Sequence, residues 1–183
     1  MLLPNEPNDS VNATTSAEQV SIFRWETLRE VGPHTLPFKE PVQGKLLRVE
    51  LTSGHTVNVF RSDDGRFYFC HGLTFGGKEA PGGAVSPFSG KDVRTILENQ
   101  YRLVTPESGA VAGDVLVWGG VGGATPHSAI VTGAVVSPGT NCLDYRSLLR
   151  SKNGKLPEAT MTLERLVDGP ESYGETYNVF RRK

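Results

Sequence analysis

Cysteine, charge of one sign and long apolar runs are all scarce in this sequence of 183 residues. Its two cysteines, Cys70 and Cys142, are too few and too far apart for the disulfide framework of a small secreted domain, so we expect both to be reduced. No apolar run approaches the roughly 20 residues of a membrane-spanning helix, so no membrane partner is expected. The 19 basic and 20 acidic residues give a net charge of −1, which predicts no nucleic-acid partner.

The N-terminal segment also lacks the parts of a Sec signal peptide, because it has neither a basic start nor an apolar core of sufficient length. We therefore expect the protein to be cytoplasmic as synthesised. Residues 1–16 are polar and contain two prolines, a composition that predicts a flexible N-terminal arm. Residues 17–183 suffice for one domain with a single core and are few for two domains.

Glycine and proline, by contrast, are abundant, with 21 and 12 residues, which predicts short elements and many turns and argues against a helix bundle. Alternating patterns predict strands over 45–51, 55–61, 66–69, 101–104, 114–118, 127–136, 142–150 and 175–181. Helical patterns cover 17–31, 93–99 and 160–167. Pro33, Pro37 and Pro41 predict irregular chain to about residue 43. This order of elements predicts an α+β fold with an antiparallel sheet.

Cys70 lies where a predicted strand ends and a glycine-containing turn begins. If a helical turn starts there, the unpaired N–H groups at its N-terminus favour a thiolate and lower the pKa of the thiol. The same N–H groups could hold the oxyanion of a tetrahedral intermediate. The alternative is a buried structural cysteine, and this segment alone does not separate the two interpretations.

His127 opens an apolar strand, a rigid mount of the kind that a catalytic base needs. A hairpin with its turn at residues 138–139 would pair residues whose numbers add to about 277, which places Arg150 opposite His127. Ser151 and Asn153 would then lie beside the imidazole, where a side-chain oxygen could fix the tautomer and complete a Cys–His–polar triad. The simpler interpretation of Asn153 is a turn residue, because Asn-Gly is a common turn pair.

The sequence gives less reason to place the other histidines in a catalytic site. His71 follows Cys70 directly and is interpreted as a bystander or a groove residue, because adjacent side chains on a strand or turn point apart. His34 and His55 are interpreted as solvated surface residues. No close Cys or His pair has the spacing of a zinc site, and no glycine pattern matches a nucleotide-binding loop. The sequence therefore predicts no metal and no cofactor.

Three phrases, FYFCHGLTFGG, AGDVLVWGG and HSAIV, together resemble the NlpC/P60 and CHAP superfamily of papain-like cysteine peptidases and amidases. The resemblance covers about residues 66–154. It implies an NlpC/P60-type fold, in which a helix start bearing the cysteine packs on a central antiparallel sheet. It also implies that Cys70 is the nucleophile and His127 the base, with Asn153, or alternatively Ser151, as the third residue.

The sequence departs from the family pattern on the C-terminal side of the cysteine. The family's cysteine usually begins a long helix, whereas Gly76-Gly77 and Pro81-Gly82-Gly83 would cut such a helix short. His71 also replaces the small residue that usually follows the cysteine. These departures affect the assignment of the third residue and the expected substrate groove more than the assignment of the Cys–His pair.

The resemblance implies hydrolysis of amide bonds through a thioacyl-enzyme, with peptides of the bacterial cell wall (peptidoglycan) as the substrate. Without a Sec signal, such an enzyme would need another export route, as a secreted antibacterial effector would, and an effector would have an immunity or inhibitor protein as partner. The same triad also suits a deamidase, transglutaminase or acyltransferase acting on a protein or lipid. A third interpretation is a non-catalytic binding module in which Cys70 is merely buried.

Overall fold

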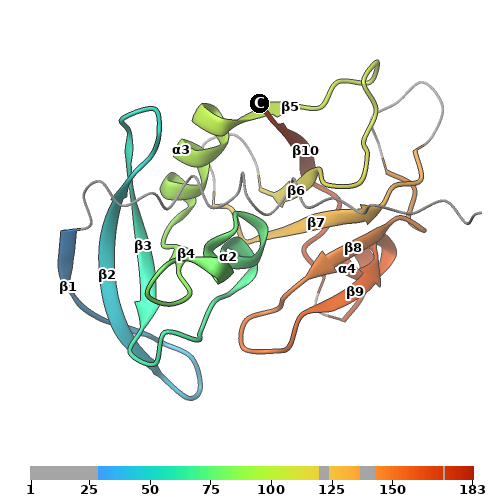
Figure 1. The fold of residues 1–183 in the computed structure, drawn as a ribbon. Coiled ribbons are helices and arrows are strands. Elements are labelled where there is room, and N and C mark those ends of the chain that lie inside the picture. Colours follow the sequence, from blue (N-terminus) through green and yellow to red (C-terminus); the bar gives the residue numbers. More distant parts are fainter. Residues whose placement is uncertain (1–28, 120–123, 137–142, 171) are drawn as a thin grey trace, which may run out of the picture.

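A computed structural model of the chain describes residues 29–119, 124–136, 143–170 and 172–183, and their strands form two antiparallel sheets (Figure 1). The first sheet has the strand order β1 (Arg29–Leu36), β2 (Val42–Glu50), β3 (Thr56–Ser62) and β4 (Ser86–Pro87). The second has the order β5 (Tyr101–Leu103), β10 (Tyr177–Arg182), β6 (Val115–Trp118), β7 (His127–Gly133), β8 (Leu148–Ser151) and β9 (Ala159–Thr162). The described helices are α2 (Cys70–Thr74), α3 (Gly90–Gln100) and α4 (Leu163–Asp168), with a 3-10 turn, η2 (Gly77–Glu79).

Two antiparallel sheets with few helices are compatible with the predicted α+β class. The sequence led us to expect one central sheet, however, and the structure has two. Helix α2 lies between them in Figure 1, and α3 connects them, running from the side of β4 to the start of β5. Within the described ranges, none of the helices combines the length and the apolar character that a membrane span requires.

The first sheet contains the predicted hairpin of β2 and β3, closed by backbone hydrogen bonds between Leu51 and His55 and between Gly54 and Leu51. The prediction of irregular chain to about residue 43 is wrong, because β1 includes Pro33 and pairs with β2. A proline is tolerated there because β1 is an edge strand and its missing N–H removes no bond from the interior of the sheet.

The predicted strand over residues 66–69 is also wrong, because this segment is extended but joins no sheet. Hydroxyl groups take the place of a partner strand. The N–H of Phe67 donates to Ser62 Oγ at 3.1 Å, and the N–H of Phe69 donates to Ser86 Oγ at 3.1 Å. These two bonds direct the chain into the start of α2.

The second sheet contains the predicted pairing of β7 with β8, in a different register. Ile130 lies opposite Arg150, whereas the predicted register would have paired it with Ser147. A bulge between Val131 and Gly133 interrupts the ladder, and β7 ends at Gly133, so the pairing does not run evenly back to a turn. The predicted turn at 138–139 lies outside the described residues.

Helix α3 confirms the prediction of a helix over 93–99, and Ser89 caps its N-terminus. Ser89 Oγ accepts the N–H of Asp92, and the Asp92 carboxylate accepts the N–H of Ser89, which forms a capping box. The predicted helix over 160–167 is correct in part, since β9 continues to Thr162 before α4 begins. The predicted arm at 1–16, most of the predicted helix at 17–31 and Cys142 lie outside the described residues.

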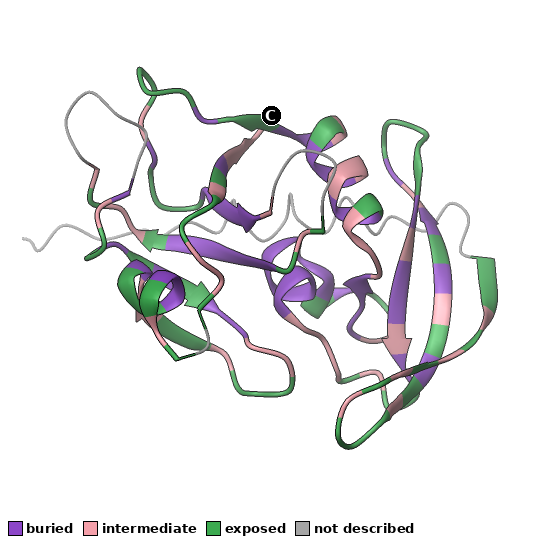
Figure 2. Ribbon diagram, turned by 180° about the vertical axis from the view of Figure 1, so that it is seen from behind, coloured by how far each residue is buried: buried purple, intermediate pink, exposed green. Residues whose placement is uncertain are grey.

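Two apolar clusters hold these elements together. The first packs the first sheet against α3, the residue after α2 and β6 of the second sheet, with Val59, Phe75 and Ile96 among its fully buried side chains. The second packs the second sheet against α4, with Trp118 and Leu149 among its largest buried side chains. In Figure 2, α2 and most of β7 are coloured as buried, so the junction between the sheets is an interior region of the molecule.

Candidate active site

Helix α2 begins at Cys70, as the sequence predicted for this residue. The extended Phe69 precedes it, and the first backbone bond of the helix runs from the N–H of Leu73 to the Phe69 carbonyl at 3.0 Å. The helix ends after one turn, because Gly76 adopts a left-handed conformation with φ of 79°. The glycines after the cysteine therefore shorten the helix, as predicted.

Gly72 determines how closely α2 approaches the first sheet. A Cβ at this position would lie 2.3 Å from Ser86 Oγ and 2.7 Å from the carbonyl oxygen of Val85. No side chain larger than hydrogen fits without a shift of β4 or of the helix. This contact fixes the depth at which the Cys70 thiol is held.

His127 is the first residue of β7, and its imidazole is 1% exposed. The Tyr173 ring stacks on it in parallel, with centroids 3.9 Å apart, and the Trp118 ring lies 5.4 Å from it. Its Nε2 hydrogen-bonds to Ser151 Oγ at 2.7 Å, which leaves Nδ1 free for the Cys70 thiol, whose pKa this imidazole lowers and with which it lines one cavity. The structure thus brings Cys70 and His127 together.

Of the two candidates for the third residue, Ser151 contacts the imidazole and Asn153 does not. Asn153 Oδ1 accepts a hydrogen bond of 3.4 Å from Ser151 Oγ, so it stands one position further from His127. Strand β8 ends at Ser151, and the chain then turns through Gly154, whose φ is 51°. The turn that the Asn-Gly pair predicted carries Asn153 away from the ring.

His71, interpreted from the sequence as a bystander, is part of the site. Its imidazole is buried beside Cys70, whose charge acts on it, and hydrogen-bonds to two groups of the second sheet and the segment before it. Nδ1 lies 2.8 Å from Ser128 Oγ, and Nε2 lies 2.8 Å from the Thr125 carbonyl oxygen. The sequence argument assumed a strand or turn, but both residues lie in a helical turn, where adjacent side chains diverge by only about 100°.

The electrostatics of the site favour a thiolate. Burial by itself would raise the pKa of the Cys70 thiol, but the charge of His71 and the interactions of the thiol with the imidazoles of His127 and His71 outweigh burial and lower the pKa to about 5. Burial also works to lower the pKa of His71, yet the neighbouring Cys70 raises it above the ordinary histidine value. At neutral pH the sulfur therefore carries the negative charge.

Lys152 is a further charged group near the sulfur, and no sequence signal pointed to it. The residue is 8% exposed, and its Nζ donates to the Leu156 carbonyl at 2.6 Å and lies 5.0 Å from the centre of the Tyr68 ring. Burial lowers the pKa of Lys152, while Glu158 and the Cys70 thiolate act to raise it. Lys152 thus adds positive potential on the side of the loop after β8.

The Cys–His pair opens onto a cavity of about 300 Å³. Its walls come from both sheets and from the loops after β1 and β8. The lining residues are Leu36, Pro37, Phe38, Phe69, Cys70, Pro126, His127, Gly154 and Tyr173. Besides Cys70 and His127, this lining consists of apolar and aromatic side chains and one glycine, so the space around the sulfur is largely apolar.

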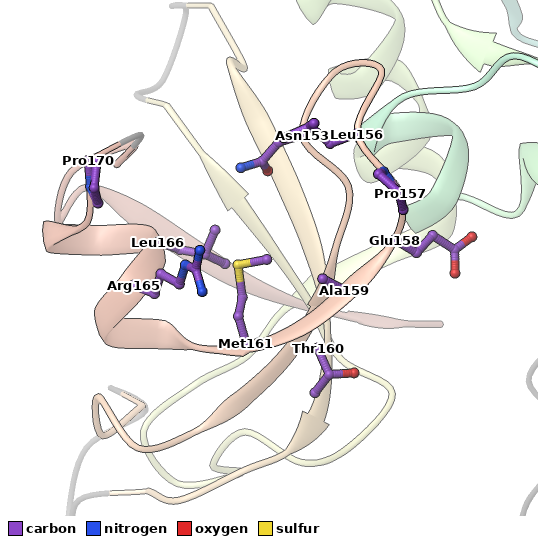
Figure 3. A pocket seen from close by; sticks show the side chains of 10 residues that line it. All are labelled: Asn153, Leu156, Pro157, Glu158, Ala159, Thr160, Met161, Arg165, Leu166 and Pro170. Carbon is purple, nitrogen blue, oxygen red and sulfur yellow. The ribbon is translucent and has the colours of Figure 1, made fainter.

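A larger cavity of about 550 Å³, shown in Figure 3, is also lined by the loop after β8. Asn153 lines this cavity, and the next residue, Gly154, lines the smaller one. In Figure 3, the side chains of Arg165, Met161 and Asn153 extend towards the middle of the cavity, while the Glu158 carboxylate points away. Glu158 instead accepts a hydrogen bond from the Tyr68 hydroxyl and pairs with Lys78.

Among the residues that the structure describes, no three His, Cys, Asp or Glu side chains are grouped closely enough to hold a metal ion. Comparison with protein-family models, with curated proteins and with solved structures gives no match for this chain. The functional argument therefore depends on the geometry of Cys70, His127 and their neighbours.

Proposed function

We propose that this protein is a cysteine hydrolase of the papain-like, NlpC/P60 type, which cleaves amide bonds through a thioacyl-enzyme. The observation that carries the proposal is the Cys70 thiol at the start of α2, which lines one cavity with the buried His127 and whose pKa the neighbouring imidazoles lower to about 5. An inert structural cysteine would keep a pKa near or above its ordinary value, because burial in apolar surroundings raises it.

The reaction begins with the Cys70 thiolate and the protonated His127. The sulfur attacks the amide carbonyl, the carbon–nitrogen bond breaks, and His127 Nδ1 gives its proton to the departing amine. The neutral His127 then takes a proton from water, and the resulting hydroxide displaces the sulfur to release the acid. Ser151 accepts the Nε2–H of His127 throughout and keeps the ring in one orientation.

The two cavities support a peptide as the substrate. The smaller, apolar cavity at the sulfur suits an uncharged segment next to the scissile bond, and the larger cavity gives room for residues further along the chain. The guanidinium of Arg165 in the larger cavity would pair with a carboxylate of the peptide. Peptidoglycan peptides carry both amide bonds and free carboxylates, which is why we propose a cell-wall substrate.

Digestion of purified peptidoglycan by the wild-type protein and by Cys70→Ala tests this function. We expect the wild type to release muropeptides with a new amine and a new carboxylate, which mass spectrometry identifies, and Cys70→Ala to release none. Cys70→Ala must keep the circular dichroism spectrum and melting temperature of the wild type. Equal product from both proteins, or none from either on peptidoglycan and on a panel of amide-bearing peptides, would contradict the proposal.

Acyl transfer is the second candidate function, and the apolar lining of the smaller cavity favours it. A thioacyl group in such surroundings meets little water, so an amine can compete for the acyl carbon. Incubation of a glutamine-containing protein with a primary amine distinguishes the reactions. A conjugate indicates transfer to the amine, a mass increase of about one dalton indicates deamidation, and a shortened chain indicates peptide hydrolysis.

A further inference from the structure

The hydrogen bonds of His71 form a continuous chain of contacts with a carbonyl oxygen at each end. On one side of the ring, His71 Nε2 contacts the Thr125 carbonyl oxygen. On the other side, His71 Nδ1 contacts Ser128 Oγ at 2.8 Å. Ser128 Oγ in turn contacts Thr74 Oγ1 at 2.9 Å, and Thr74 Oγ1 contacts the Cys70 carbonyl oxygen at 2.9 Å. All of these side chains are buried. The protons in this chain can therefore be counted.

A carbonyl oxygen can only accept a hydrogen bond, and a hydroxyl has only one proton to donate. Thr74 must donate its proton to the Cys70 carbonyl, so Ser128 must donate its proton to Thr74. The contact between Ser128 and His71 then requires the proton of Nδ1, and the contact with Thr125 requires the proton of Nε2. Only the imidazolium form of histidine donates from both nitrogens.

We infer that His71 is a permanently protonated positioning residue, a buried cation that keeps Cys70 ionised while taking no part in proton transfer. Both of its protons are donated to oxygen atoms that cannot return one, whereas His127 keeps one ring nitrogen, Nδ1, that Ser151 does not bind and that can shuttle the catalytic proton. The site would thus divide two tasks between two histidines. His71 supplies a fixed positive charge, and His127 supplies the acid and base.

The other charged groups around His71 are compatible with this division. Within its own helix His71 faces the Cys70 sulfur, which carries the balancing negative charge. Strand β7 contributes His127, and the loop after β8 contributes Lys152, whose ammonium is hydrogen-bonded to a carbonyl. Glu158, the carboxylate that acts on Lys152, is itself paired with Lys78 and hydrogen-bonded to Tyr68. The thiolate is therefore the counter-ion of His71.

Alkylation of Cys70 by iodoacetamide as a function of pH tests the inference, in a Cys142→Ser background so that only one thiol reacts. We expect the wild type to react at nearly the same rate from pH 6 to pH 8, because its thiolate is already formed. In His71→Gln the rate at pH 6 should fall by more than about tenfold and should rise with pH as a free thiol does. In His127→Ala the rate at pH 6 should stay within about threefold of the wild type, because His71 remains.

Substitutions at Thr74 give a matched pair that leaves His71 in place. Thr74→Val removes the hydroxyl at almost constant shape, so Ser128 becomes free to donate to Nδ1 and His71 can lose its proton. Thr74→Ser keeps the hydroxyl. We expect alkylation at pH 6 to slow several-fold in Thr74→Val and to be unchanged in Thr74→Ser. Equal rates in the two variants would overturn the inference.

Nitrogen-15 NMR of labelled histidine gives an independent measurement that requires no folding-sensitive variant. We expect both ring nitrogens of His71 to show imidazolium shifts at pH 7, and a neutral tautomer there would overturn the inference. The inference deepens the proposed hydrolase function, but these measurements use no substrate. An intact thiolate without amidase activity would therefore contradict the function alone, and activity with a neutral His71 would contradict this inference alone.

Discussion

Ser151 and Asn153 lie two residues apart, and only Ser151 reaches the imidazole of His127. The 2.7 Å contact with Nε2 fixes the tautomer in which Nδ1 faces the sulfur, and Asn153 acts on the ring only through Ser151. A hydroxyl is a weaker orienting group than a carboxylate, because it carries no charge to stabilise the imidazolium. The second histidine, His71, supplies positive charge at the sulfur, so the thiolate depends less on a carboxylate that would stabilise the imidazolium of His127.

Ser151→Ala should lower kcat/KM by about tenfold to a hundredfold, because the ring loses its orienting acceptor while the nucleophile remains. Asn153→Ala should have a much smaller effect, since it removes only a 3.4 Å contact to Ser151. Steady-state kinetics on the same peptide compare the two variants, with alkylation of Cys70 as a control for an intact thiolate. A larger loss in Asn153→Ala than in Ser151→Ala would restore Asn153 as the third residue.

The pH dependence of activity follows from the lowered pKa of Cys70. Because the folded protein ionises the thiol at a pKa of about 5, well below that of an ordinary cysteine, activity requires a pH above this value. We expect kcat/KM to be nearly flat near neutrality and to fall by about tenfold per pH unit as the pH drops below 5. A profile that rises steadily from pH 7 to pH 9 would show that the free enzyme holds a neutral thiol.

At the scale of elements, the short helix α2 depends on a glycine that is not at its end. Helix propensity favours alanine over glycine by up to about 1 kcal/mol, but a Cβ on Gly72 would collide with Ser86 and with the backbone of Val85. The collision involves backbone atoms, so it cannot be relieved by rotating one side chain. Packing, rather than helix propensity, therefore determines that residue 72 is glycine.

Gly72→Ala should lower the free energy of unfolding by about 1–3 kcal/mol, as overpacking of an interior contact does, and should reduce activity by displacing the sulfur. Gly133→Ala is the matched control, because its new Cβ would lie 3.4 Å from Leu148 Cβ, an ordinary contact. Urea denaturation of both variants measures the difference. Equal stability of Gly72→Ala and the wild type would show that α2 can move away from β4 without cost.

At the scale of the whole molecule, the site is shared between the two sheets. The corner after β1, with Leu36, Pro37 and Phe38, forms one wall of the cavity at the sulfur, and Gly154 and Tyr173 from the second half of the chain form another. The Phe38 ring also packs edge-on against Phe67, with centroids 5.6 Å apart. The first sheet thus shapes the cavity without supplying a group that reacts.

Phe38→Ala should raise KM by about tenfold, equivalent to roughly 1.4 kcal/mol of lost apolar contact with substrate, and should leave kcat nearly unchanged. The alkylation profile of Cys70 should be that of the wild type, because no hydrogen bond of the Cys–His pair involves Phe38. Peptide kinetics measure the changes in KM and kcat, and alkylation of Cys70 measures whether the thiolate is unchanged. A loss confined to kcat would mean that this wall positions the catalytic groups rather than the substrate.

The sequence by itself determined the elements that local rules control. Helix α3 and the hairpin of β2 and β3 follow from apolar periodicity, alternation and glycine placement within a few residues of each feature. The helix start at Cys70 was implied by the family resemblance, and the glycines after it predicted that this helix would be short. The pairing of Cys70 with His127 was also predicted, from the resemblance and from the place of each residue at the start of an element.

Only the tertiary structure decided the features that depend on contacts between distant segments. The end of β8 at Ser151 and the turn at Gly154 put Ser151 rather than Asn153 at the imidazole, and an edge position allowed Pro33 in a strand. The role of His71 depends on oxygen atoms from Thr125 and Ser128, more than fifty residues away. Such contacts arise from packing, which no local pattern encodes, so the charge of His71 could not be read from its neighbours in the chain.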